Sequence, residues 1–263
     1  MYSYLIDTIV LIFLGYAVVY PLFLWITPLK YIDVGFYRFN LGMCCVVGAL
    51  GVIGYHGIQS SFIINKYIWI WFVLLLIITA YYWNSNKINN FIISMVSLFG
   101  CFAMIGLIEH ISPTINHIGL LFVSLLGSMI TACVFFAMIL GHWYLNVISL
   151  PIKLLKKSIL VFTILLLVRI TWDAIYLNLE EVTDPYGISY SLLEFTLEFE
   201  GFLLLIALFM GNFFPIVLNY FIWKTLKLQA TQSATGLIYV SVVSILFGDL
   251  IFKFYLLQFG FLI

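Results

Sequence analysis

The chain has 263 residues, of which 65% are hydrophobic and only 8% carry a charged side chain. A soluble domain carries about 25% charged residues, so a water-exposed globular domain is excluded and most of this surface must contact lipid. The 11 basic and 11 acidic residues cancel, and this balance gives no reason to expect nucleic acid as a partner. We therefore predict an integral membrane protein whose first partner is the lipid bilayer.

Eight apolar runs are long enough to cross a bilayer, which takes about 20 residues in a helix. No connection between them is long enough to form a soluble domain. We therefore predict an all-α bundle of about eight transmembrane helices and a single polytopic domain over residues 1–263. The predicted spans are residues 9–26, 39–55, 67–83, 91–108, 118–140, 158–177, 199–223 and 236–257.

The first 25 residues lack the basic segment of a signal peptide and carry Asp7 instead, so we expect them to be retained as the first span. The four cysteines fall within apolar runs, without CxxC spacing or a histidine nearby. Small apolar packing residues are therefore expected in place of metal ligands or disulfide partners. These cysteines are Cys44, Cys45, Cys101 and Cys133.

Basic residues are concentrated in alternate connections, which predicts the orientation of the chain. The even-numbered connections hold only Lys66. By the positive-inside rule, the odd-numbered connections face the cytoplasm or the mitochondrial matrix, and both termini lie on the outer (periplasmic or intermembrane) side. A bacterial cytoplasmic membrane is the predicted location, with the mitochondrial inner membrane as the alternative. The odd-numbered connections contain Lys30, Arg38, Lys87, Lys153, Lys156, Lys157, Lys224 and Lys227.

The connection between the sixth and seventh spans, residues 178–198, is acidic and contains no basic residue. Asp184-Pro185-Tyr186-Gly187 within it predicts a turn. Glu194 and Glu198 stand four residues apart, so we expect them on one face of a helix that runs into the seventh span.

Rare polar residues gather by topology at the outer ends of the spans. Histidine or arginine would hydrogen-bond a carbonyl oxygen of a quinone headgroup, and a carboxylate would take the proton released on oxidation. Quinone is therefore the cofactor that this set suggests, although helix ends near water also tolerate polar residues without a ligand. The set consists of His56, Glu109, His110, His117, Arg169 and Asp173.

His142 lies at the inner end of the fifth span, in Gly141-His142-Trp143-Tyr144. It is either part of an interfacial aromatic belt or an inner contact for a quinone or haem headgroup. Ligation of haem b needs histidines on facing helices at matched depth, a condition that His56 and His110 meet only crudely. We expect no other metal site.

Two oppositely charged pairs lie inside apolar spans at a spacing of four residues, Arg169 with Asp173 and Asp249 with Lys253. The first pair either neutralises itself inside the bundle or leaves Arg169 to orient an anionic or carbonyl group of a ligand or a partner subunit. For the second pair, pairing and snorkelling toward the interface are both open.

Three features predict how individual helices pack. Pro215, between Asn212 and Asn219, predicts a kink in the seventh span, and broken helices are one indication of a transporter site. The polar stretch 229–236 suits a helix start or close packing. A row of glycines in the second span predicts a closely packed helix face, formed by Gly48, Gly51, Gly54 and Gly57.

The layout of eight spans with almost no mass outside the membrane is similar to that of membrane-anchor subunits of respiratory oxidoreductases, a similarity of layout that assigns no residue. It implies a quinone-contacting subunit of a redox complex, not itself catalytic, with further membrane or peripheral subunits as partners. The alternatives are a small-solute or ion transporter, favoured by the intramembrane charges and the kinked span, and a structural or assembly subunit without a ligand.

Overall fold

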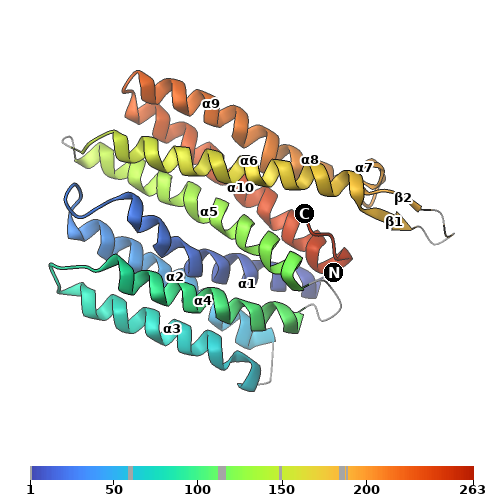
Figure 1. The fold of residues 1–263 in the computed structure, drawn as a ribbon, viewed down its shortest axis with the longest axis horizontal. Coiled ribbons are helices and arrows are strands. Elements are labelled where there is room, and N and C mark those ends of the chain that lie inside the picture. Colours follow the sequence, from blue (N-terminus) through green and yellow to red (C-terminus); the bar gives the residue numbers. More distant parts are fainter. Residues whose placement is uncertain (1, 59–61, 112–116, 148–149, 184–186, 188) are drawn as a thin grey trace.

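The computed structural model describes residues 2–58, 62–111, 117–147, 150–183, 187 and 189–263 and confirms the all-α membrane bundle with eight helical spans (Figure 1). The seventh span is built from three consecutive helical segments. The spans are α1 (Tyr2–Val19) with the 3₁₀-helix η1 (Tyr20–Ile26), α2 (Val34–Ile58), α3 (Phe62–Trp83), α4 (Asn90–Ile111), α5 (His117–Asn146), α6 (Lys153–Leu179), α8 (Phe202–Leu208) with the π-helix η2 (Phe209–Phe213) and α9 (Phe214–Lys227), and α10 (Thr231–Phe259).

Both ends of the chain lie at the same end of the bundle, as an even number of spans requires (Figure 1). Most helices extend beyond the predicted apolar runs, because a helix continues into the interfacial layer after its hydrophobic part ends. The first span changes from α to 3₁₀ geometry at Tyr20, next to Pro21, whose missing N–H removes an α-helical hydrogen bond. Which end faces outward stays a prediction from the distribution of lysine and arginine.

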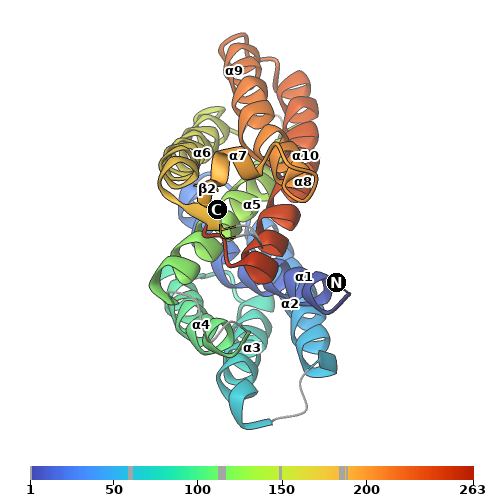
Figure 2. The ribbon, with the colours of Figure 1, turned by 90° about the vertical axis from the view of Figure 1, so that its right-hand side faces the viewer.

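Helices α1 and α5 occupy the centre of the bundle (Figure 2). Helix α1 packs against α2, α4, α5 and α10, and α5 packs against α6 and α10. Helices α2, α3 and α4 form one side of the molecule, and α6, α9 and α10 form the other. The outer faces of these helices carry large exposed apolar side chains, such as Ile53 and Ile77, which is the surface that a lipid environment requires.

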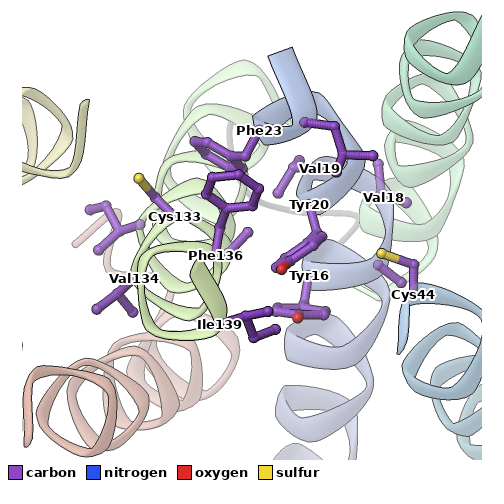
Figure 3. Close-up of a cluster of buried hydrophobic side chains, with 14 of the residues drawn as sticks. Tyr16, Val18, Val19, Tyr20, Phe23, Cys44, Cys133, Val134, Phe136 and Ile139 are labelled. Atoms are coloured by element: carbon purple, nitrogen blue, oxygen red, sulfur yellow. The ribbon is translucent and has the colours of Figure 1, made fainter. Parts of the chain in front are cut away.

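Aromatic side chains fill the contact between the first and fifth spans (Figure 3). The ring of Phe136 lies 5.9 Å from that of Tyr20 and 6.2 Å from that of Phe23, measured between centroids. The buried Tyr20 hydroxyl donates to Asn40 Oδ1 on α2. This aromatic core therefore connects the first, second and fifth spans, and the Tyr20–Asn40 hydrogen bond lies inside it. The cysteines are free and buried or half-buried, as predicted.

The predicted glycine face of α2 packs closely against α1. A Cβ atom on Gly51 would lie 2.8 Å from the Leu14 side chain and 3.1 Å from its backbone nitrogen, and one on Gly54 would lie 3.0 Å from Val10. Glycine is needed here because two backbones approach too closely for a larger side chain. Gly57 lies outside the residues whose surroundings are described.

A small hairpin and one helical turn form the connection after the sixth span. Strands β1 (Glu181–Thr183) and β2 (Ser189–Ser191) pair antiparallel. Helix α7 (Leu192–Phe195) follows and begins with a capping box between Ser191 and Glu194. The predicted turn residues 184–186 lie outside the described part, while Gly187 has a positive φ of 84°.

The prediction that Glu194 and Glu198 share one face of a continuous helix was wrong. Helix α7 ends at Phe195, and the chain turns sharply before α8. A Cβ on Gly201 would lie 1.9 Å from the carbonyl oxygen of Phe195, so the chain folds back on itself here. Spacing along the sequence does not reveal such a reversal.

Candidate functional site

The two predicted ion pairs are both formed, and both are buried in the second half of the bundle. Arg169 Nε donates to Asp173 Oδ2 over 2.9 Å along α6, with the two residues 3% and 1% exposed. Lys253 Nζ lies 2.5 Å from both carboxylate oxygens of Asp249 along α10. Lys253 is only 2% exposed, so it pairs inside the bundle and does not snorkel to the interface.

Uncharged residues of neighbouring helices complete each pair. The side-chain amide of Asn212, in the π-helix η2, donates to Asp173 Oδ2 over 2.7 Å. The hydroxyl of Thr131, on α5, donates to Asp249 Oδ2 over 3.2 Å. The charges on α6 and α10 are therefore each tied to a second element, which fixes how the helices pack around them.

A small cavity joins the two pairs into one network. The guanidinium carbon of Arg169, on α6, lies 4.4 Å from the centre of the ring of Phe252, the neighbour of Lys253 on α10. The cavity has a volume of about 10 Å³, about the space that one water molecule needs. Its walls are Gly127, Ile130, Arg169, Gly211, Asn212, Ile245, Asp249 and Phe252.

Two glycines bring the seventh and eighth spans close enough to form this network. A Cβ atom on Gly248 would lie 2.4 Å from the Cα of Gly211, so the two backbones are in direct contact. The Ser244 hydroxyl donates to the carbonyl oxygen of Met210 in the same region. The π-helix, located just before Pro215, makes such a carbonyl available, because its hydrogen bonds are displaced from the α-helical pattern.

The site lies in the outer half of the membrane by the predicted orientation. At a rise of about 1.5 Å per residue, Arg169 is roughly 15 Å from the outer end of α6 at Leu179. An unpaired arginine, lysine or aspartate at such depth costs roughly 2.5–3.5 kcal/mol on insertion scales. Pairing two cations with two carboxylates makes the network neutral and offsets most of this cost.

Three polar atoms in the network have no hydrogen-bond partner among the residues that the structure describes: Arg169 Nη2, Asp173 Oδ1 and Asn212 Oδ1. Asn212 is 7% exposed, so none of the three residues is in ready contact with lipid headgroups or bulk water. Buried polar atoms are almost always paired. Two of these three residues, Arg169 and Asn212, line the cavity, where a water molecule or an ion could satisfy them.

The other predicted outer residues do not join this network as far as the structure describes them. His56 is exposed on α2, where its ring lies 6.3 Å from that of Trp69; α2 and α6 stand on opposite sides of the bundle (Figure 2). The side chains of Glu109, His110 and His117 lie outside the described part of the structure.

His142 is exposed at the opposite end of α5, next to Trp143, which packs edge-on against Phe36. Among the described residues, no group of three His, Cys, Asp or Glu side chains is placed to hold a metal ion. The charged network combines the predicted Arg169 and Asp173 with residues of three other spans, the fifth, seventh and eighth.

Sequence reasoning missed that the two ion pairs adjoin and that Asn212, Thr131 and Phe252 contact them. The sequence singled out Asn212 only as part of a kinked span. Its position about one turn before Pro215 was the one feature that could have indicated a role in the network. Thr131 and Phe252 gave no signal, because threonine and phenylalanine are ordinary residues in a membrane helix.

An apolar groove lies on the lipid-facing side of α6 and α5, with a volume of about 430 Å³. Trp172 lines it, stacks on Tyr176 and donates from its indole to the carbonyl oxygen of Leu262. The other lining residues are Phe122, Ile164, Leu167, Val168, Thr171 and Ile175.

The comparisons with known proteins add no assignment: no family model, curated protein or solved structure matches this chain. The chemistry of the buried network is therefore the principal guide to function.

Proposed function

We propose that this protein carries a small ion across the membrane and that the network of Arg169, Asp173, Asn212, Asp249 and Lys253 is the site through which the ion passes. The observation that carries the proposal is the burial of four charged side chains in two ion pairs, one member of each lining a cavity, in a chain that has few charges at all. Charged residues inside a membrane are retained at a cost, and they mark ion and proton pathways.

The size of the cavity favours an ion over an organic solute. A volume of about 10 Å³ accommodates one water-sized species, whereas pockets for organic ligands measure roughly 300–1,000 Å³. The chain therefore holds its charges around a space suited to a proton, a water molecule or a small ion.

The π-helical turn in the seventh span supports the same function. Single π-helical turns within α-helices are rare and occur frequently at functional sites. Helix η2 contains Asn212, the residue that contacts Asp173. The π-helical turn and the charges thus coincide in space.

Reconstitution in liposomes tests the proposal. Purified protein should carry H⁺, Na⁺, K⁺ or a halide down an imposed gradient, measured with ion-sensitive dyes. We expect the flux to fall at least tenfold in Asp173→Asn. The matched control is Asp33→Asn on the first connection, where the aspartate is exposed and its side chain accepts from the nearby Gly35 N–H. This variant should retain full flux. Flux no greater than that of protein-free liposomes would overturn the proposal.

The apolar groove favours a second function, a quinone-contacting subunit of a respiratory complex. A volume of about 430 Å³ lined by Phe122 and Trp172 suits an aromatic headgroup with part of its isoprenoid chain. Native purification followed by mass spectrometry should then reveal a bound quinone that is lost in Trp172→Ala. For the predicted outer set, His110→Ala should lower quinol turnover of the assembled complex; unchanged turnover would exclude His110.

A further inference from the structure

The hydrogen bonds of Asp173 are unevenly distributed between its two oxygens. Oδ2 accepts from Arg169 Nε over 2.9 Å and from Asn212 Nδ2 over 2.7 Å. Oδ1 accepts from no group, and neither does Oδ1 of Asn212. A buried acceptor left without a donor is unfavourable, because it has lost its hydrogen bonds to water and gained none in return. These two acceptors belong to residues that are already bonded to each other, and the unpartnered donor beside them, Arg169 Nη2, belongs to the residue that bonds Asp173 Oδ2.

One proton on Asp173 would satisfy both oxygens. A carboxylic acid and a primary amide are complementary: the amide N–H donates to one acid oxygen, and the acid O–H donates to the amide oxygen. The first of these two bonds is present between Asn212 and Asp173. The second would join the two unpartnered oxygens.

We infer that the ion handled at this site is a proton and that it binds on Oδ1 of Asp173, shared with the amide oxygen of Asn212. This inference rests on the proposed ion transport and specifies its substrate. Binding forms one O–H bond on Asp173 and turns the Arg169 ion pair into a hydrogen bond to a neutral acid. Release of the proton restores the carboxylate and the ion pair.

The surrounding charges make a metal cation a poor fit. Arg169 and Lys253 already balance the two carboxylates, and both oxygens of Asp249 lie 2.5 Å from Lys253 Nζ. Among the side chains of the network that the structure describes, two oxygens lack a hydrogen-bond partner, one on Asp173 and one on Asn212, whereas hard cations such as Ca²⁺ and Mg²⁺ take six or more oxygen ligands. A proton needs no further ligand.

The charged groups near Asp173 set the net charge of the network once a proton has bound. Its own helix contributes Arg169, and α10 contributes Asp249 and Lys253; η2 and α5 contribute only the uncharged Asn212 and Thr131 among the described residues. Among the other elements that pack against α6, α7 carries Glu194, whose side chain is exposed. The basic residues of α9, Lys224 and Lys227, lie in its last turn at the inner end. With a proton on Asp173, the network holds two cations and one carboxylate, a net charge of one positive unit.

Infrared difference spectroscopy on the protein in lipid membranes tests this inference without a transport assay. A step from high to low pH should produce the C=O band of a hydrogen-bonded carboxylic acid. The band should be absent in Asp173→Asn and retained in Asp33→Asn. In Asn212→Leu, which removes the amide, the band should move to the position of an acid without a hydrogen bond.

The results separate the inference from the function on which it rests. An Asp173-dependent band in a protein that carries no ion would uphold the proton site and refute transport. Flux of Na⁺ or K⁺ that is unaffected by pH, with no band that depends on Asp173, would refute the proton site and uphold transport. If Asp173→Asn fails to fold, the Asn212→Leu spectrum decides: an unshifted band overturns the assignment.

Discussion

Breaking the Asp249–Lys253 pair should cost more stability than removing it. In Lys253→Met, the Asp249 carboxylate loses a cation that lies 2.5 Å from both of its oxygens and keeps only the Thr131 hydroxyl at 3.2 Å. Removing one partner of a buried pair costs about 3–5 kcal/mol, because the remaining charge has no counterion. Asp249→Asn should cost a similar amount for the same reason, since it strands the Lys253 ammonium.

The double variant should recover most of that loss. With asparagine and methionine in place, no charge remains at this part of the cavity, and replacement of a buried pair by neutral groups of similar volume is often nearly neutral. The free energy of unfolding can be measured in mixed micelles by titration with SDS, followed by circular dichroism. Destabilisation of the double variant equal to the sum of the two single variants would show that the residues act independently, and a loss below about 1 kcal/mol in either single variant would refute the buried pair.

Two further predictions concern topology and packing. Cysteines introduced at Lys156 and Glu181 should react with a membrane-impermeant reagent from opposite sides of the membrane. The native cysteines should react slowly, because they are buried or half-buried. Labelling of both introduced cysteines from the same side would refute the eight-span topology. Gly248→Ala should cost about 1–3 kcal/mol of unfolding free energy, because its Cβ would meet the backbone of Gly211 at 2.4 Å. Gly106→Ala is the matched control, since nothing lies within 4 Å of its Cβ, and equal effects of the two changes in a thermal unfolding assay would contradict the close crossing.

The spans could be predicted because bilayer thickness sets a length that apolar runs must meet. The pairing of Arg169 with Asp173 was also predictable, since residues four apart share a helix face. The proximity of the two ion pairs, in contrast, could not be predicted. In helices that are apolar all round, hydrophobic periodicity does not distinguish the face toward another helix from the face toward lipid.

The hairpin and the sharp turn before α8 escaped prediction for another reason. The spacing of Glu194 and Glu198 is compatible with a helix, but α7 ends at Phe195 and the chain turns before α8. This turn brings the Phe195 carbonyl too close to Gly201 for any side chain there. Such a contact depends on how α7 packs against its surroundings, which local sequence does not record. The outer set that contains His110 stays a prediction.

The spacing of the two ion pairs has a consequence for how the protein enters the membrane during synthesis. Each cation lies on the same helix as its counterion, one turn away. The sixth and eighth spans can therefore each neutralise their own charge as they leave the insertion machinery, before the other helix is present. If the pairs were instead formed between helices, Arg169 on the sixth span would lie in lipid without a counterion until the eighth span was inserted. Replacement of one residue of a pair should therefore impair insertion of the span that carries this pair and leave insertion of the other span unchanged.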